Sequence, residues 1–274
     1  MRSLASGKTP YADMTVLYRT HAQSRAIEDE LRDKSVPYRI VGGHRFYDRK
    51  EVKDVLSYLR LVCNPDSDVD LLRIINVPSR GIGASTVKRL GEIAGSRKIG
   101  LWAALPVAET AAEIGRKERM QLKGFRDCLT EFGRTVESDK PSAFCERLLR
   151  GTGYTRMWQD LQRELAKDGK KSEADDAGER VRNVGEVVSA IAAYELRAAE
   201  DGRRATLGDY LQMVSLTAEE AKDESVQKVS LMTVHAAKGL EFGYVWIVGM
   251  EEGRFPLGAV DTDPLALEEE RRLA

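Results

Sequence analysis

The most informative residues of this sequence are two closely spaced glycines in the segment Asn76–Thr86, NVPSRGIGAST. Apolar side chains recur at helical spacing before and after it, so Gly81-Ile82-Gly83 is predicted to form a hairpin between two helices. Without a Cβ the backbone turns tightly and its N–H groups can approach a phosphate, beside the amides that open the following helix. Ile82 would anchor the hairpin on the helices. The pattern is typical of a helix-hairpin-helix element that binds DNA, although a simple helix–helix turn would need the same glycines.

The charge of the surrounding sequence favours binding to a polyanion. The whole chain has a net charge of −1, whereas residues 71–100 contain six basic side chains and one acidic side chain. The bases are Arg73, Arg80, Lys88, Arg89, Arg97 and Lys98, and the acid is Glu92. Contacts from these bases would go to the phosphate backbone, so binding should be independent of base sequence and should weaken as salt is added.

A second polar group, TVHAAKGLEF at 233–242, follows a run of apolar and β-branched residues that is predicted to be a buried strand. Ligands of open α/β sheets bind at the carboxyl ends of the strands. Thr233 and His235 could donate hydrogen bonds to a phosphodiester there, and Glu241 could accept one from a ribose hydroxyl. The same residues could instead be a packed histidine and an exposed Lys238–Glu241 pair.

Arg19 follows another predicted strand, Met14–Tyr18, at the same kind of edge. Its guanidinium could hold a phosphate while Tyr18 stacks on a base. The alternative is that Tyr18 belongs to the core and that Arg19 is only solvated.

Several other classes of site and protein are disfavoured. Gly7-Lys8-Thr9 lacks the earlier glycine, the preceding strand and the following helix of a phosphate-binding loop. The three cysteines and three histidines are widely spaced, which predicts neither a disulfide framework nor a metal centre. With 42% hydrophobic residues the chain can bury a core, but no apolar run approaches the roughly 20 residues that span a bilayer. We therefore expect a cytoplasmic globular protein with no membrane partner.

Hydrophobic periodicity predicts the elements that position these residues. Residues 14–41 are predicted to form strand, helix and strand, and buried strands return at 228–234 and 244–250, as in a parallel α/β sheet. The residues between them are predicted to be almost continuously helical. Apolar stripes run over 52–59, 68–76, 84–94, 117–137, 141–150, 179–199 and 206–216. Residues 167–179 lack large apolar side chains and are predicted to be a mobile loop.

These elements combine into one α/β domain with a large insertion. The sheet domain would comprise residues 1–41 and 226–274, and the all-α insertion, which contains the helix-hairpin-helix, would comprise residues 42–225. Gly42-Gly43 is a candidate hinge between them because consecutive glycines leave the backbone unusually free.

Six blocks of the sequence resemble, in the same order, bacterial UvrD/PcrA/Rep-type superfamily 1 DNA helicases. TVHAAKGLEF is similar to the motif V of that family and is the most specific of the blocks. The blocks are LYRTHAQSR (17–25), PYRIVGGHRFYDRKEVKDVLSYLRL (37–61), INVPSRGIGAST (75–86), LMTVHAAKGLEF (231–242), VGMEEGRFP (248–256) and EEERRLA (268–274).

The resemblance implies that the chain is the C-terminal half of such a motor. Residues 1–41 and 226–274 would form an incomplete RecA-like domain 2A, which stops before motif VI, and residues 42–225 would form subdomain 2B. ATP and Mg²⁺ would serve the full-length enzyme, with none bound to this chain alone. The partners would be single-stranded DNA, its junction with duplex DNA, the N-terminal RecA-like half, and repair or replication proteins of the nucleoid.

The resemblance also assigns roles to single residues. Arg19 and His235, with Thr20 and Thr233 as weaker matches, would contact single-stranded DNA. Glu241 would meet the sugar of ATP, with Gly239 beside it. His21 replaces the asparagine that is usual in its block. The residues that would grip duplex DNA are Arg80, Gly81, Ile82, Gly83, Thr86 and Lys88.

The predicted activity is ATP-dependent 3′–5′ DNA unwinding by the full-length protein. Phosphoryl transfer needs a phosphate cradle, a metal ion and arginines across a cleft. The 274 residues alone are therefore expected neither to hydrolyse ATP nor to unwind DNA. The alternative is a standalone helix-hairpin-helix module that binds DNA or docks a protein, without motor activity.

Overall fold

A computed structural model describes residues 9–42, 45–219, 227–258, 268 and 271–272 of the chain. Gly7, Lys8 and Gly43, which belong to the disfavoured phosphate loop and to the candidate hinge, lie outside these residues, as does most of the block 268–274. The chain divides into two compact units: unit 1 is Met1–Arg49 with Glu220–Ala274, and unit 2 is Lys50–Glu219. The assignment of 1–41, 42–225 and 226–274 to RecA-like and helical subdomains remains a prediction.

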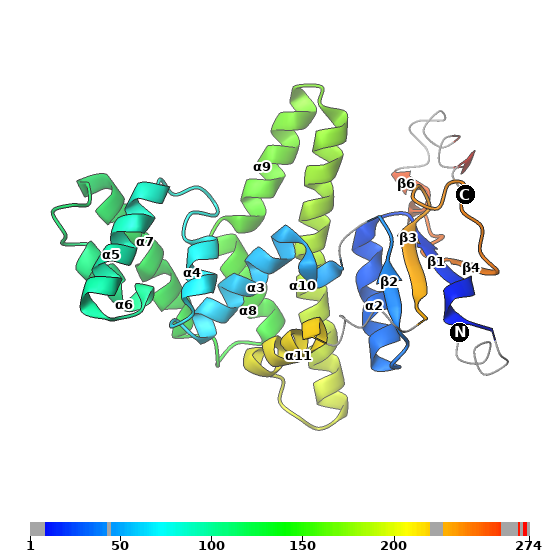
Figure 1. Ribbon diagram of the computed structural model, residues 1–274, viewed down its shortest axis with the longest axis horizontal. Coiled ribbons are helices and arrows are strands. Elements are labelled where there is room, and N and C mark those ends of the chain that lie inside the picture. Colours follow the sequence, from blue (N-terminus) through cyan, green and yellow to red (C-terminus); the bar gives the residue numbers. More distant parts are fainter. Residues whose placement is uncertain (1–8, 43–44, 220–226, 259–267, 269–270, 273–274) are drawn as a thin grey trace. The chain divides into compact units, whose positions relative to one another are not determined.

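Unit 1 contains a four-stranded sheet in the order β2-β3-β1-β4, and every neighbouring pair is parallel (Figure 1). The predicted parallel α/β sheet is therefore confirmed. A smaller two-stranded sheet, β5–β6, follows. The elements are η1 Tyr11–Asp13, β1 Met14–Tyr18, η2 His21–Gln23, α2 Ser24–Asp33, β2 Tyr38–Ile40, η3 Phe46–Asp48, β3 Val229–Thr233, β4 Tyr244–Ile247, β5 Gly253–Arg254 and β6 Leu257–Gly258.

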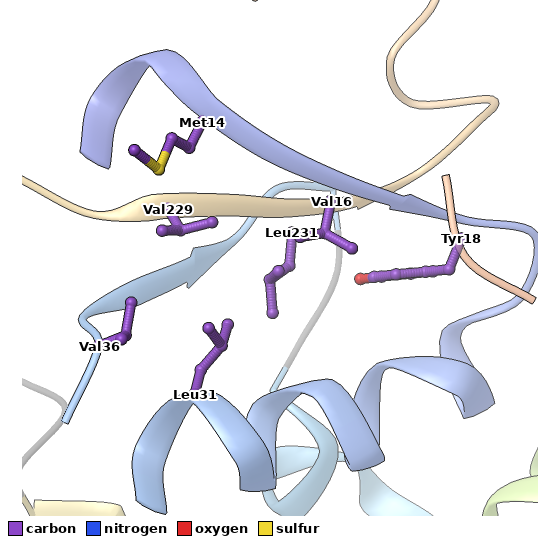
Figure 2. Close-up of a cluster of buried hydrophobic side chains, with 7 residues drawn as sticks. All are labelled: Met14, Val16, Tyr18, Leu31, Val36, Val229 and Leu231. Atoms are coloured by element: carbon purple, nitrogen blue, oxygen red, sulfur yellow. The ribbon is translucent and has the colours of Figure 1, made fainter. Parts of the chain in front are cut away.

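The core of unit 1 lies between its central strands and α2. Figure 2 shows seven buried side chains that meet there, and both halves of the chain contribute to them. They are Met14, Val16, Tyr18, Leu31, Val36, Val229 and Leu231. Burial of these apolar side chains fixes the register in which β3 pairs with β1, so it also fixes the residues that follow the two strands.

β4 differs from its prediction as a strand covered on both faces. Tyr244, Val245 and Ile247 are 40%, 47% and 39% exposed. Within the described residues β4 pairs only with β1, so it is an edge strand of this sheet. Apolar composition alone does not distinguish an edge strand from a central one, which explains the error.

Unit 2 consists of helices (Figure 1). Most of the predicted stripes coincide with a helix, whereas α6 and α9 were not predicted. The helices are α3 Lys50–Cys63, α4 Asp68–Ile74, α5 Ala84–Arg97, α6 Leu101–Ala108, α7 Arg116–Gly133, α8 Pro141–Gly151, α9 Tyr154–Lys167, α10 Lys171–Glu200 and α11 Leu207–Glu219. None of the described helices is long and apolar enough to cross a membrane.

The predicted loop at 167–179 is wrong, because α10 already begins at Lys171. α9 and α10 form a long pair of adjacent helices in Figure 1, joined by only three residues. The buried residues near the start of α10 are small: Ala174, Ala177 and Gly178. Small side chains let the two backbones approach closely, so the contact face lacks the large apolar residues that the prediction sought.

Candidate nucleic-acid interfaces

Asn76 builds the hairpin between α4 and α5 that was predicted from its glycines. Its Oδ1 accepts hydrogen bonds from the backbone N–H groups of Arg80 at 2.7 Å and Ile82 at 3.2 Å. Gly81 has φ +75°, a left-handed conformation that favours glycine. Ile82 is 1% exposed, which places it in the core beneath the hairpin. Sequence reasoning passed over Asn76, although asparagine often closes turns in this way.

The outer side of the hairpin presents backbone and positive charge. Gly81 and Gly83 are exposed, as are Lys88 and Arg89 on the first turns of α5. Gly83 is the N-cap of α5, and no side chain caps the helix there. The first turns of α5 therefore combine opening amides, the positive end of the helix dipole and two exposed basic residues, an arrangement suited to a phosphate. Lys88 pairs only loosely with Glu92 at 3.9 Å, and its side chain is 80% exposed.

Three of the residues predicted to contact duplex DNA are turned into the protein, and Ile82 in the core is one of them. Thr86 is 3% exposed, and its N–H donates to the Gly83 carbonyl at 3.0 Å, so its side chain lies beneath the surface. Arg80 is half-buried, and its guanidinium donates to backbone carbonyls, including that of Ile74 at 3.0 Å. It also donates to the hydroxyl of Tyr58. Burial raises the pKa of Tyr58, and the positive charge of Arg80 opposes that shift.

In unit 1 the ends of β1 and β3 bring together the four residues predicted to contact single-stranded DNA. Tyr18 pairs with Thr233 in the sheet register, and the N–H of Val234 donates to the Tyr18 carbonyl at 2.9 Å. The residues that follow, Arg19 with Thr20 and His235, therefore emerge side by side. We call Arg19, Thr20, Thr233 and His235 the strand-end surface; His235 is exposed and the other three are half-buried.

Gln23, which sequence reasoning also missed, holds one side of the strand-end surface. Its Oε1 accepts from the N–H groups of Arg19 at 2.9 Å and Thr20 at 3.0 Å. Gly249, just after β4, has φ +71°, and a Cβ there would lie 2.4 Å from Nε2 of Gln23. The ends of β1 and β4 therefore meet at this glutamine. The only signal in the sequence was a glutamine close behind a strand.

The ends of β2 and β3 meet beside it. A Cβ on Gly42, which follows β2, would lie 3.4 Å from the Cβ of Ala236. Thr233 Oγ1 accepts from the N–H of Ala236 at 3.2 Å and so shapes the turn that carries His235. All four strands thus end at one edge of the sheet, where a parallel α/β sheet places its ligand.

The residues predicted to bind nucleotide lie farther along the same segment. Gly239 has φ +81° and is exposed, and Glu241 is exposed as well. An exposed carboxylate fits a role as acceptor for a sugar hydroxyl. Within the described ranges, no group of three or more His, Cys, Asp or Glu side chains is placed to hold a metal ion.

Comparison with known proteins gives a consistent result. The sequence model of the family described as UvrD-like helicase C-terminal domain matches residues 1–274. The ATP-dependent DNA helicase PcrA of Bacillus subtilis (strain 168) is 36% identical over 273 residues, which cover 98% of this chain and 35% of the relative. PcrA of Staphylococcus epidermidis (strain ATCC 35984) is 36% identical over 275 residues, covering 100% of this chain and 36% of the relative. The chain thus spans about a third of the length of the curated relatives it matches.

Proposed function

The chain belongs to the UvrD-like helicase C-terminal domain family, and from this we propose that it is the C-terminal part of an ATP-dependent 3′–5′ DNA helicase. Unit 1 would be the RecA-like domain 2A, which contacts single-stranded DNA. Unit 2 would be subdomain 2B, whose helix-hairpin-helix contacts the duplex. The meeting of Arg19 and His235 at the shared edge of four parallel strands is the observation that carries the proposal.

The strand-end surface supports contact with single-stranded DNA. Arg19 offers a planar cation and His235 offers a ring nitrogen. The two residues follow the paired ends of the neighbouring strands β1 and β3. Neither contact reads base identity, so the strand can move past the surface without loss of affinity. Gln23 fixes the backbone of Arg19, and Thr233 fixes the turn of His235, so both groups are held in place before DNA binds.

The hairpin surface supports contact with duplex DNA. Gly81 and Gly83 expose backbone, and the uncapped start of α5 supplies N–H donors for a phosphate. Lys88 and Arg89 add charge on the following turn of the helix. Binding of this kind follows the shape and charge of the backbone, as a protein that meets every sequence at a fork requires.

The nucleotide role in this chain is limited to Glu241 and its neighbour Gly239. The carboxylate of Glu241 would accept a hydrogen bond from the ribose of ATP, and Gly239 would let the backbone turn toward it. ATP with Mg²⁺ would supply the phosphoryl transfer that moves the protein along the strand. In this proposal the full-length protein works on DNA in the cytoplasm, together with repair or replication proteins.

The proposal is tested by measuring the affinity of the purified chain for single-stranded, blunt duplex and tailed duplex DNA at several salt concentrations. Lys88→Gln with Arg89→Gln should reduce the salt slope of duplex binding by up to about two, because each lost phosphate contact removes about 0.9. Arg19→Gln with His235→Ala should weaken single-strand binding and leave the duplex slope unchanged.

The matched control is Arg156→Gln with Arg163→Gln, which removes the same charge from exposed positions on α9. If this control lowers the duplex slope as much as the α5 pair does, the binding is diffuse and the hairpin is not the site. If the Arg19 and His235 pair leaves single-strand affinity unchanged, the assignment of the strand-end surface is wrong.

A further inference from the structure

Arg80 stands in the middle of the sequence that was predicted to grip DNA, yet its contacts lie within the protein. We infer that Arg80 is a positioning residue, which holds the hairpin in its DNA-binding shape and does not itself contact phosphate. The inference rests on the proposed duplex contact at the hairpin and identifies what keeps that contact rigid.

The first set of contacts joins Arg80 to the end of α4 and to the hairpin itself. Its Nη1 donates to the carbonyls of Ile74 at 3.0 Å, Pro78 at 3.2 Å and Ile75 at 3.4 Å. Ile74 is the last residue of α4, so the cation lies at the negative end of that helix dipole, where the last carbonyls lack helical partners. Loss of the guanidinium would remove the side-chain donor from all three carbonyls, although the Ile74 carbonyl would keep its bond from the N–H of Val77 at 3.0 Å.

The second set of contacts joins Arg80 to other helices of unit 2. Its Nη2 donates to the hydroxyl of Tyr58 on α3 and, at 3.5 Å, to the carbonyl of Thr152, which follows α8. The guanidinium also lies over the ring of Tyr58 at 5.9 Å and over the ring of Phe125, on α7, at 5.3 Å. Both rings are at least 97% buried, so Arg80 is packed against the core of the unit.

Tyr58 links Arg80 to the start of the hairpin turn. While its oxygen accepts from Arg80, its hydroxyl donates to the carbonyl of Val77, inside the turn that leads to the hairpin. Asn76 then bonds the N–H groups of Arg80 and Ile82. The turn is therefore held at both of its ends by hydrogen bonds. All the oxygen atoms that accept these bonds are uncharged.

The geometry of these contacts requires arginine, because it uses two nitrogen atoms of one planar fork and the flat face of the group at once. Lysine carries the same charge on a single, tetrahedral ammonium and cannot make this set. A residue that only contacted phosphate would tolerate lysine, since lysine is a good phosphate ligand. The Arg-to-Lys change therefore separates positioning from direct contact.

The test uses the whole chain and measures duplex affinity against salt concentration for four variants. We expect Arg80→Gln and Arg80→Lys to weaken binding alike, by at least about tenfold, because several hydrogen bonds to a charged group are lost. The salt slope should stay within about 0.3 of the wild-type value in both, since no phosphate contact is removed. Lys88→Gln should instead reduce the slope by about 0.9, whereas Arg156→Gln, at an exposed position on α9, should retain wild-type affinity and slope.

Two outcomes of this measurement would overturn the inference: wild-type affinity in Arg80→Lys, or a slope reduced by about 0.9 in Arg80→Gln. Tyr58→Phe, which deletes one oxygen from a buried ring, provides a milder variant and should also lower affinity at constant slope. If the wild-type chain shows no salt-dependent duplex binding, the proposed function fails instead.

Amide hydrogen exchange tests the positioning role of Arg80 in the absence of DNA. Arg80→Gln should speed exchange across residues 76–83, whereas Lys88→Gln should not. Unchanged exchange across residues 76–83 in Arg80→Gln would refute the positioning role.

Discussion

Two side-chain amides shape the two candidate interfaces. Asn76 holds the hairpin by accepting from two backbone N–H groups, and Gln23 holds the start of the strand-end surface in the same way. In each case a side-chain oxygen satisfies turn amides that have no partner in a helix or sheet. The cationic residues that would meet DNA are thus carried on backbone that is already fixed, so less entropy is lost on binding.

Gly249→Ala tests this arrangement in unit 1. The new Cβ would lie 2.4 Å from Nε2 of Gln23, at a residue whose φ of +71° already disfavours a side chain. We expect a loss of about 1–3 kcal/mol in the free energy of unfolding from the backbone strain. Single-strand binding should weaken as well, because a shift of Gln23 away from the new Cβ would weaken its bonds to the amides of Arg19 and Thr20. Urea unfolding and DNA titration measure the two effects.

The control for that prediction is Gly91→Ala, at an exposed glycine inside α5 with nothing within 4 Å of the new Cβ. This change should stabilise the protein by about 0.5–1 kcal/mol, since alanine is the better helix former. Equal effects of the two substitutions would show that the contact between Gly249 and Gln23 is unimportant.

At the scale of elements, η3 is anchored to α2 by one buried carboxylate. Glu28 is 2% exposed and accepts from Ser24 Oγ at 2.7 Å and from the N–H of Phe46 at 3.3 Å. Arg49, the last residue of unit 1 before α3, donates to the same serine at 3.0 Å. These contacts tie Phe46 and Arg49 to α2 within unit 1.

This anchor predicts a pH dependence. Burial raises the pKa of Glu28, while hydrogen bonds and Arg49 oppose the shift. The folded state therefore holds the proton more tightly than the unfolded state, so the stabilising contribution is complete below the unfolded pKa of about 4.3 and is lost as pH rises through the folded value. Relative to wild type, Glu28→Gln should become progressively more favourable as pH rises above the unfolded pKa of about 4.3.

Urea unfolding of both proteins at each pH gives the difference in free energy directly. Glu30→Gln, an exposed change on the same helix, is the control. A difference that is constant across the pH range would show that Glu28 does not titrate there.

The contact between α9 and α10 predicts a strong effect of side-chain size. A Cβ on Gly178 would already lie 2.6 Å from Nε2 of Gln162 on α9. Gly178→Leu should destabilise unit 2 by about 1–3 kcal/mol through overpacking. Asp175→Leu, on the exposed side of the same helix, should have little effect on the thermal midpoint. A neutral result for Gly178→Leu would mean that the helix pair is not closely packed.

The sequence predicted elements well where large apolar residues mark a buried face, as in β1, β3 and α3. It failed where burial depends on the partner element and not on the apolar content of the segment itself. α10 buries Ala174 and Ala177 against a neighbour, and β4 lies at an edge that its composition does not reveal. The predicted surfaces show the same limit, because two acceptors of Arg80, the hydroxyl of Tyr58 and the carbonyl of Thr152, come from distant parts of the chain.

At the scale of the whole molecule, unit 2 is one continuous segment with its own core. Its largest buried side chains, Tyr58, Phe144, Tyr154 and Tyr210, all come from within residues 50–219. We expect residues 50–219, expressed alone, to unfold cooperatively and to bind duplex DNA with the same salt slope as the full chain. Circular dichroism on heating and a binding titration test this. An unfolded fragment would show that unit 2 depends on unit 1.

The activity of the whole chain gives the last prediction. The chain spans about a third of the length of its relatives, and we assign only Glu241 and Gly239 to the nucleotide. Purified protein should therefore release no phosphate from ATP above background, with or without single-stranded DNA. Hydrolysis that Glu241→Ala abolishes, and that Glu252→Ala at a nearby exposed position leaves intact, would contradict this.

The strand order β2-β3-β1-β4 has a consequence for folding during synthesis on the ribosome. β1 and β2 emerge early but are not neighbours, because β3 must enter the space between them, and β3 is made only after all of unit 2. The apolar faces of β1 and β2 therefore stay unpaired while all of unit 2 is synthesised and folds. Slow elongation through unit 2 would lengthen that exposure, so the yield of intact protein should respond to chaperones that shield unpaired strands.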